Sequence, residues 1–293
     1  MIAIIINPIA GGARPEAARR RAELAASVLA ASHEGGEVFV TERKGHAREL
    51  AIAALTRGVR LIIAWGGDGT INEVGSAAVF GQTPLGIVPA GSGNGLATDL
   101  RVSRRPERAL LEAFGASPRA IDAGELGGRM FFATAGVGFD AHIASCFDRE
   151  IAGPRGLSTY LRISTRELLA YRLSTYRVCR DAGTRERRAL LVTFANASQF
   201  GNGARIAPGA RLDDGVLDLV VFEEVSRLRT FCAVPRFLAG RVTGLRGWSV
   251  ERIERAAIES DRPMAFHVDG EPVEGGTRLE ARVHPGALRV CVR

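Results

Sequence analysis

Short apolar runs alternate with longer helical patterns over roughly the first 125 residues. Runs rich in Ile, Leu and Val predict buried strands, and apolar positions recurring every three or four residues predict helices. The predicted strands are residues 2–6, 38–40, 61–64 and 85–88, and the predicted helices are residues 15–31, 46–56 and 71–79. Regular alternation of strand and helix is typical of a parallel sheet covered by helices. The pattern therefore predicts an α/β domain with a parallel sheet.

The pattern changes after Asp122 to β-rich segments separated by Gly, Asn and Asp turns. Predicted strands are residues 131–135, 190–195, 216–222 and 266–268, with a strand-like run at 288–292. Short strands between such turns favour a mainly antiparallel β-sandwich. We place the domain border near residues 126–129, which gives an α/β domain over 1–126 and a β-sandwich domain over 127–293.

Residues 151–188 carry nine arginines with Leu and Tyr between them. The simplest interpretation is a solvated helix with a charged loop, and the alternative is a contact with an anionic membrane. The net charge of +7 could attract nucleotides, nucleic acid or such a membrane, and charge alone does not choose among them. The second interpretation therefore depends on what the rest of the chain does.

Composition favours an ordinary globular protein, with 46% hydrophobic and 24% charged residues, and excludes disordered and fibrous classes. The chain has no apolar stretch of about 18 residues and begins MIAIIINP, without the basic segment of a signal peptide. The spacing of Cys146, Cys179, Cys232 and Cys291 fits neither a zinc site nor a disulfide framework. We expect a soluble protein in the reducing cytoplasm.

Glycine-rich turns follow three of the four predicted parallel strands, at residues 7–12, 66–70 and 89–95. Glycine permits positive φ and brings backbone N–H groups close to a bound oxyanion, and a helix N-terminus favours negative charge. One such turn alone is more often a tight connection in which Asp68 caps a helix. Three turns at one edge of a sheet together predict a phosphate-binding site.

The chain has no G-x-x-x-x-G-K-[ST] loop and no G-x-G-x-x-G after its first strand, which excludes the common P-loop and dinucleotide-binding folds. Its motifs instead form an ordered series: NPIAGG at 7–12, Thr41 with GHA at 45–47, GGDGTINEV at 66–74, PAGSGN at 89–94, GVGFDA at 136–141, RLDDGVLD at 211–218 and VDGE at 268–271. In this order and spacing the chain resembles bacterial diacylglycerol kinase-like lipid kinases, with sphingosine and ceramide kinases as more distant relatives.

The resemblance implies an N-terminal domain similar to NAD kinases and phosphofructokinases, a β-sandwich C-terminal domain, and ATP with Mg²⁺ as cofactors. Asp68 would help to hold the metal of the nucleotide, because a carboxylate among phosphates is repulsive without a cation between them. By position, the residues that would line ATP are Asn7, Pro8, Ala10, Gly11, Thr41, Gly66, Gly67, Asp68, Gly69, Thr70, Asn72, Glu73 and Ser92.

Asp269 and Glu271 follow the predicted strand 266–268, where an Asp-Gly pair by itself indicates a hairpin turn. The resemblance places in this motif an acid that orients the acceptor hydroxyl and accepts its proton, and the sequence leaves open which of the two acids does so.

Two further sites are implied by position. In the turn at 211–218, the resemblance implies a structural Mg²⁺ held by the Asp214 carboxylate and the backbone carbonyls of Arg211 and Val216. By the resemblance, Asp140 matches a position that contacts the lipid head group in sphingosine kinases. The alternative role for Asp140 is the N-cap of a helix over residues 141–147.

These features predict an ATP- and Mg²⁺-dependent kinase for a hydroxyl of a diacylglycerol-like lipid, acting peripherally at the cytoplasmic membrane face. We expect the lipid and an anionic membrane surface as its partners, and no nucleic acid. These features are also compatible with a homodimer. Asn94-Gly95 stands where many bacterial diacylglycerol kinases have an Asp after the Asn, so the lipid itself stays open. The alternatives are a kinase for a soluble acceptor such as NAD, and a regulatory nucleotide-binding module without turnover. The five scattered histidines are expected to have structural roles.

Overall fold

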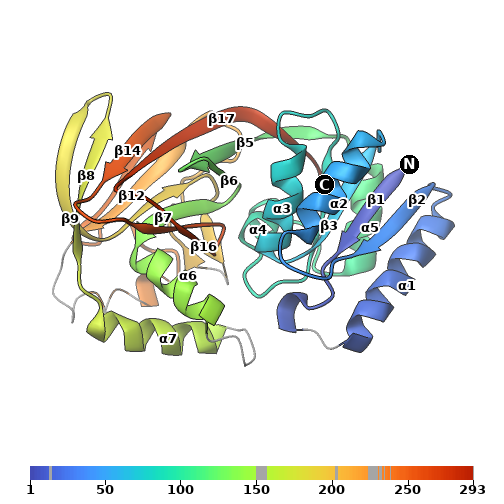
Figure 1. The fold of residues 1–293 in the computed structure, drawn as a ribbon, viewed down its shortest axis with the longest axis horizontal. Helices are drawn as coiled ribbons and strands as arrows, with labels where there is room; N and C mark the ends of the chain where they lie inside the picture. Colours follow the sequence, from blue (N-terminus) through green and yellow to red (C-terminus); the bar gives the residue numbers. More distant parts are fainter. Residues whose placement is uncertain are drawn as a thin grey trace. The chain divides into compact units, whose positions relative to one another are not determined.

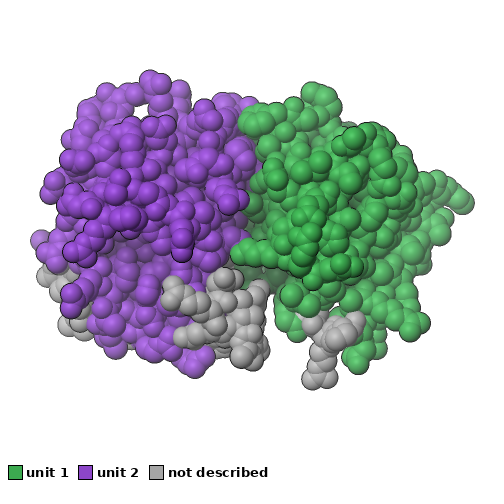
Figure 2. All heavy atoms as spheres, viewed as in Figure 1, with its two compact units in different colours: residues 1–121, 286–293 green, residues 122–285 purple. Residues whose placement is uncertain are grey.

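The chain divides into two units, which Figure 2 colours separately. The computed structural model describes residues 1–12, 15–149, 157–201, 204–223, 230, 233, 235–237 and 239–292. Unit 1 contains Met1–Ile121 and Gly286–Arg293, and unit 2 contains Asp122–Pro285. Two strands, β5 (Arg119–Leu126) and β17 (Arg278–Cys291), run from one unit into the other (Figure 1). The last residues of the sequence therefore belong to unit 1.

A parallel sheet forms the centre of unit 1. Its strands lie in the order β2 (Gly36–Val40), β1 (Ile2–Ile6), β3 (Leu61–Gly66) and β4 (Leu85–Pro89), and Val290–Cys291 of β17 adds a further parallel strand beside β4. The four predicted strands are confirmed, with β2 beginning two residues earlier than expected. Because all of these strands run in the same direction, the turns that follow β1 to β4 meet at one edge of the sheet.

Helices cover both faces of this sheet, with α1 (Pro15–Ala31) packed on α5 (Pro106–Gly115) and α2 (His46–Thr56) packed on α3 (Asp68–Ala78). Alternate residues of β1 point to opposite faces, and Ile2, Ile4 and Ile6 share one core cluster with α1 and α5. Burial on both faces explains why these strands consist of uninterrupted apolar runs. The short helices η1 (Ala10–Gly12) and α4 (Gly95–Asp99) lie in the glycine-rich turns.

Antiparallel strands dominate unit 2. The long strand β9 (Gly183–Ala195) is central to it, since its first half pairs with β8 (Ser174–Arg180) and its second half pairs with β7 (Thr134–Gly138) and β12 (Leu217–Glu223). The other strands are β6 (Arg129–Phe131), β10 (Gln199–Gly201), β11 (Ala204–Arg205), β13 (Trp248–Ile253), β14 (Arg255–Glu259), β15 (Ala265–Val268) and β16 (Glu271–Glu274). Side chains of the β9 and β12 strands point into two apolar clusters, a larger one that contains Val192 and Leu219 and a smaller one that contains Leu191, Val220 and Phe222.

The prediction of one strand over residues 131–135 is wrong in one respect. The segment belongs to two strands, β6 and β7, with a break at Phe132 and Ala133. The break has a clear cause. The backbone N–H groups of Phe132, Ala133 and Thr134 donate to the carboxylate of Asp269, 135 or more residues away in the sequence. A side chain therefore replaces a neighbouring strand as their partner.

The helix predicted within residues 151–188 is also corrected. Helix α7 covers only Leu157–Ala170, residues 150–156 lie outside the described part, and β8 and most of the first half of β9 make up the rest. In β8, buried Tyr176 and Val178 alternate with exposed Arg177, the period of a strand. Several of the arginines form ion pairs within unit 2, namely Arg177 with Glu259, Arg180 with Glu251 and Arg187 with Glu223.

Helix α6 (Phe139–Arg149) begins directly after β7 and packs against β15, β16 and α7. It contains the helix predicted over residues 141–147. In the part of the chain that the structure describes, no helix is both long and apolar enough to cross a membrane.

Candidate active site

The three glycine-rich loops of unit 1 are joined to one another by side chains. The Asn7 amide nitrogen, after β1, donates to the hydroxyl of Thr70, after β3, at 3.0 Å. The carboxylate of Asp68 accepts the backbone N–H groups of Asn94 at 2.8 Å and Gly95 at 2.9 Å, in the loop after β4. The sequence prediction that these loops converge at one sheet edge is therefore met in the geometry of unit 1.

Glycine is required where the loops touch. Gly11 has φ +73°, and a Cβ atom there would lie 2.4 Å from the carbonyl oxygen of Ala90. A Cβ on Gly66 would lie 2.4 Å from the Thr70 hydroxyl oxygen, and one on Gly91 would lie 2.6 Å from the Cα atom of Gly67. These separations are too short for any side chain. The loops can be this close only because the positions are glycine.

Arg21 holds the first loop from behind. Its guanidinium group donates to the carbonyl oxygens of Asn7 at 2.8 Å and Ala10 at 3.0 Å. Burial lowers the pKa of Arg21, and an arginine stays charged even so. No sequence pattern marks Arg21 for this role, because it lies on an ordinary helix with other arginines beside it.

Glu73 fixes the turn after β2. Its carboxylate accepts the backbone N–H of Gly45 at 2.8 Å and of Arg48 at 3.4 Å, at the start of α2. Thr41, in the same turn, is buried, and its N–H donates to the carbonyl oxygen of Ile6 at 2.9 Å. The structure thus ties the turn after β2 to α3, and through α3 to the turn after β3.

The N-terminus of α3 differs from those of α2 and α4. The carboxylates of Glu73 and Asp68 accept N–H groups at the starts of α2 and α4, respectively. The N-cap of α3 is Gly67, which has no side chain with which to cap the helix. Backbone N–H groups and the helix dipole make such an end favourable for an oxyanion. The arrangement therefore leaves the start of α3 available to a phosphate group.

All of the residues predicted to line a nucleotide lie in unit 1. Most of them lie in the loops after β1 and β3 or in the first turns of α3, while Thr41 follows β2 and the exposed Ser92 lies in the loop after β4. Asn72 accepts a hydrogen bond from the Ser76 hydroxyl at 3.3 Å within α3. Their contact with a nucleotide stays a prediction.

In unit 2, Asp269 and Glu271 lie in the turn between β15 and β16 but have different surroundings. Asp269 has φ +47°, and its carboxylate accepts three backbone N–H groups, from Phe132 at 2.9 Å, Ala133 at 2.8 Å and Thr134 at 3.1 Å. Glu271 is the first residue of β16 and is partly exposed. Asp269 therefore holds the backbone of residues 132–134 in place.

Asp140 lies in a buried polar cluster beside this turn. Its carboxylate accepts hydrogen bonds from the Thr193 hydroxyl at 2.5 Å and the Ala141 N–H at 2.8 Å, and it lies 3.2 Å from Nε2 of His267. Nδ1 of His267 accepts the N–H of Gly270 at 3.3 Å, which assigns the ring proton to Nε2, facing Asp140. The predicted lipid contact of Asp140 stays a prediction, and its carboxylate is buried at the start of α6.

The turn at 211–218 gathers acids that suit a hard cation. One carboxylate oxygen of Asp214 pairs with Arg252, and for the buried Oδ1 the described residues supply no hydrogen-bond partner. Asp122 accepts the N–H of Gly215 at 2.7 Å. Burial raises the pKa of Asp218, with a smaller contribution from Asp214. A buried carboxylate oxygen without a hydrogen-bond partner is suited to a cation, so these residues fit Mg²⁺.

The sequence does not connect Asp122 with this turn. Asp218 is one of the three acids of the RLDDGVLD motif, and its burial is what the sequence does not show. Asp122 is more than 90 residues from Gly215 in the sequence, and no local pattern connects them.

Comparison with known proteins shows the family to which this chain belongs. Residues 1–126 match the diacylglycerol kinase catalytic domain, and residues 133–292 match the YegS C-terminal NAD kinase beta sandwich-like domain. The chain is 31% identical over 277 residues to a Pseudomonas aeruginosa protein named "Probable lipid kinase YegS-like". The matched region is 92% of this chain and 89% of that protein. The chain belongs to the YegS-like lipid kinase family. This confirms the resemblance that the motifs indicated.

Other members and structures agree. A Chromohalobacter salexigens protein with the same name is 31% identical over 259 residues, which is 86% of this chain and 82% of that protein. A crystal structure of a diacylglycerol kinase from Bacillus anthracis has a TM-score of 0.74 at 18% identity and covers 100% of this chain and 96% of that one. At this identity the likeness shows the fold. The predicted fold class, a parallel α/β domain followed by a β-sandwich domain, is confirmed for this YegS-like chain.

Proposed function

We propose that this chain transfers the γ-phosphate of ATP to a hydroxyl group of a diacylglycerol-like lipid. The observation that carries the proposal is the joined set of three glycine-rich loops around the uncapped start of α3 in unit 1. Phosphoryl transfer depends on positioning and on neutralising the phosphate charge. Loops already fastened to one another supply backbone N–H groups with little loss of conformational entropy on binding.

Glu271 is the acid that we assign to the acceptor hydroxyl. The Asp269 carboxylate already accepts three backbone N–H groups, so its lone pairs serve the loop at 132–134. In the proposed reaction, the hydroxyl oxygen forms a bond to the γ-phosphorus, the bond from that phosphorus to the β,γ-bridging oxygen breaks, and the hydroxyl proton passes to Glu271. ADP leaves with the bonding electrons. Asp269 and the buried pair of Asp140 and His267 position this turn.

Magnesium has two proposed places. The Asp68 carboxylate accepts two backbone N–H groups, which fix its position among the glycine-rich loops, and it would help to hold the metal of the nucleotide. Asp214, with its buried Oδ1 and the carbonyl oxygens of Arg211 and Val216, would hold a structural ion. Bound at the phosphates, the metal would neutralise charge that develops during transfer.

The lipid acceptor implies peripheral association with the cytoplasmic face of an anionic membrane. The net charge of +7 supports such association, although several arginines of β8 and β9 are already paired with acids. Helix α7 presents an exposed Arg162 and a Leu169 side chain that is 62% exposed, which suits a lipid surface. Binding to anionic vesicles that weakens with added salt would support this part of the proposal, and salt-insensitive binding would contradict it.

The test is transfer of label from γ-labelled ATP to diacylglycerol, sphingosine, ceramide and total bacterial lipid in mixed micelles with Mg²⁺. We expect one labelled lipid with the wild-type chain. Asp68→Ala should lose transfer and weaken ATP binding, whereas Glu271→Gln should lose transfer and keep ATP binding. Glu274→Gln, an exposed acid on the same strand, is the matched control and should remain active.

Other outcomes distinguish the alternatives. Label on a soluble acceptor such as NAD, with none on lipid, would move the activity to that acceptor. ATP binding without label on any acceptor would replace the kinase by a regulatory nucleotide-binding module.

A further inference from the structure

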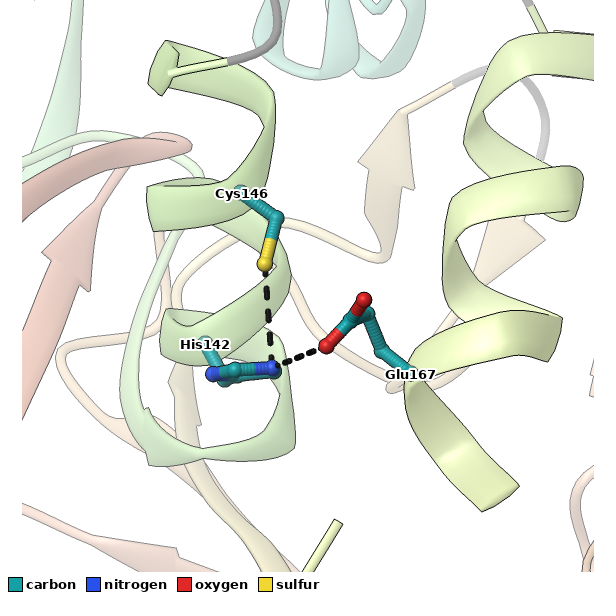
Figure 3. A group of neighbouring side chains, drawn as sticks. All are labelled: His142, Cys146 and Glu167. Atoms are coloured by element: carbon teal, nitrogen blue, oxygen red, sulfur yellow. Dashed lines mark hydrogen bonds and ion pairs between the residues drawn. The ribbon is translucent and has the colours of Figure 1, made fainter. Parts of the chain in front are cut away.

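Three side chains with metal-binding chemistry meet between α6 and α7, apart from the turns discussed above. Nε2 of His142 lies 2.8 Å from Oε2 of Glu167 and 3.6 Å from Sγ of Cys146. All three ligand atoms lie within 4.8 Å of one another. Figure 3 shows that both contacts converge on the same ring nitrogen, with the sulfur and the carboxylate approaching it from different helices.

The fold explains how these residues meet. His142 and Cys146 are four residues apart on α6, so they share one face of that helix. Glu167 is 25 residues beyond His142, on α7, which packs against α6. The spacing among the cysteines does not reveal this site, because it needs a histidine from the same helix and an acid from a second helix packed against it.

The geometry is unlike that of a nucleophilic cysteine. In a catalytic triad the imidazole uses one nitrogen for the nucleophile and the other for the acid that orients it. Here Nε2 of His142 faces both Sγ of Cys146 and Oε2 of Glu167. A single nitrogen has either one proton or one lone pair, so it cannot serve as base toward the thiol while donating to the carboxylate. A cation among the three atoms would satisfy all of them at once.

Two of the three separations can be compared with those around a tetrahedral ion. Zn²⁺ bonds of about 2.0–2.1 Å to nitrogen, 2.3 Å to sulfur and 2.0–2.2 Å to oxygen separate neighbouring ligand atoms by roughly 3.3–3.6 Å. The separation of His142 Nε2 and Cys146 Sγ, 3.6 Å, is already at this value. The His142 to Glu167 separation, 2.8 Å, would need to lengthen by about 0.5 Å. One thiolate, one imidazole and one carboxylate favour Zn²⁺ over Mg²⁺.

The neighbours of the cluster keep it both accessible and oriented. The side chain of His142 is 39% exposed and that of Glu167 is 20% exposed, so an ion can enter from solvent. Arg166 pairs with Oε1 of Glu167 at 2.9 Å, which leaves Oε2 directed at His142. The ring of Tyr171 packs beside the His142 ring, with 5.3 Å between the ring centroids, and limits the rotation of the His142 ring.

We propose that His142, Cys146 and Glu167 form a Zn²⁺ site that ties α6 to α7, with a water molecule in the fourth position. This site is distinct from the Mg²⁺ chemistry of the proposed kinase and uses none of its residues. Helix α6 also contains the buried Asp140, which contacts His267 beside the 269–271 turn. An ion that fixes α6 would therefore stabilise the surroundings of that turn.

The test is competition for Zn²⁺ between the full chain, stripped of metal, and a chromophoric chelator, with Co²⁺ absorption as the spectroscopic probe. We expect one tight ion for each chain, release of a proton from the Cys146 thiol on binding, and a thiolate-to-Co²⁺ charge-transfer band. Cys146→Ser should lose that band and bind Zn²⁺ at least about 100-fold more weakly. Glu167→Gln should keep the band and weaken binding.

Cys179→Ser is the matched control, because Cys179 is a partly exposed thiol on β8, outside the cluster. It should bind like the wild-type chain. Equal Zn²⁺ affinity and an unchanged Co²⁺ spectrum in Cys146→Ser would overturn the proposal, as would absence of Zn²⁺ binding by the wild-type chain. Circular dichroism of each variant separates loss of the ligand from loss of the fold, and the lipid transfer assay separates this site from the proposed kinase activity.

Discussion

Replacing Asp269 by asparagine isolates the contribution of its charge. Its carboxylate accepts N–H groups from Phe132, Ala133 and Thr134 at 2.9, 2.8 and 3.1 Å. Asparagine has the same size and tolerates the observed φ of +47°, so the substitution adds no backbone strain. The asparagine amide has one oxygen, and its NH₂ group would face a donor. At least one of the three hydrogen bonds is therefore lost.

The expected magnitude follows from these contacts. A hydrogen bond to a charged group contributes about 1.5–3 kcal/mol, and Asp269 is only partly buried, so we expect a loss of about 2 kcal/mol. This loss should appear in the free energy of local opening of residues 132–134. Since 1.4 kcal/mol corresponds to a factor of about ten, amide hydrogen exchange there should accelerate by about 30-fold.

The matched comparison is Glu271→Gln, measured on the same preparations by hydrogen exchange with mass spectrometry and by lipid transfer. Loss of a general base lowers turnover by about 100-fold or more, and exchange at 132–134 should stay at the wild-type rate. The reasoning would be refuted on the structural side by unchanged exchange in Asp269→Asn. On the chemical side, normal turnover by Glu271→Gln would refute it.

Two further predictions concern the glycine-rich loops and the acidic turn. Gly11→Ala should weaken ATP binding and lower the thermal stability of unit 1, because its Cβ would meet the Ala90 carbonyl oxygen. Gly12→Ala has the same φ of +73° and open space around it, so it should cost only about 1 kcal/mol of stability. Calorimetry and nucleotide titration compare the two variants, and equal effects would contradict the contact between Gly11 and Ala90. Burial raises the pKa of Asp218, so its contribution favours folding below its ordinary pKa and is lost as pH rises through the raised folded-state pKa. In Mg²⁺-free buffer, Asp218→Asn should therefore raise the free energy of unfolding by urea at pH 7, with the gain shrinking as the pH falls toward the ordinary pKa of Asp, and a destabilised variant at pH 7 would show the sign to be wrong.

The sequence was most informative where structure is local. Continuous apolar runs and helical periodicity predicted β1, β3, α1 and α2 almost to the residue, because each element is decided by its own burial pattern. The convergence of the loops after β1, β3 and β4 also followed, since parallel strands share a direction. Helix α3 begins earlier than predicted, at Asp68, because its first turn lies within the glycine-rich loop itself.

Contacts between distant segments were the part that the sequence could not reveal. Nothing near residue 132 indicates that Asp269 will interrupt a strand there, and nothing in α1 marks Arg21 as the residue that holds the Asn7 loop. The strand β8 is a different case. Its alternation of Tyr176, Arg177 and Val178 was visible, and the surplus of arginine obscured it.

Strand β17 has a consequence for how the protein is synthesised. Its last residues, Val290 and Cys291, pair with Leu85 and Gly86 of β4, and the carbonyl oxygen of Ala287 accepts the N–H of Phe80. Residues 286–293 leave the ribosome only after all of unit 2 has been translated. Until then, β4 has an open edge that can pair with other chains. Completion of unit 1 therefore waits for the end of translation, and a nascent chain stalled before residue 286 would be prone to aggregation.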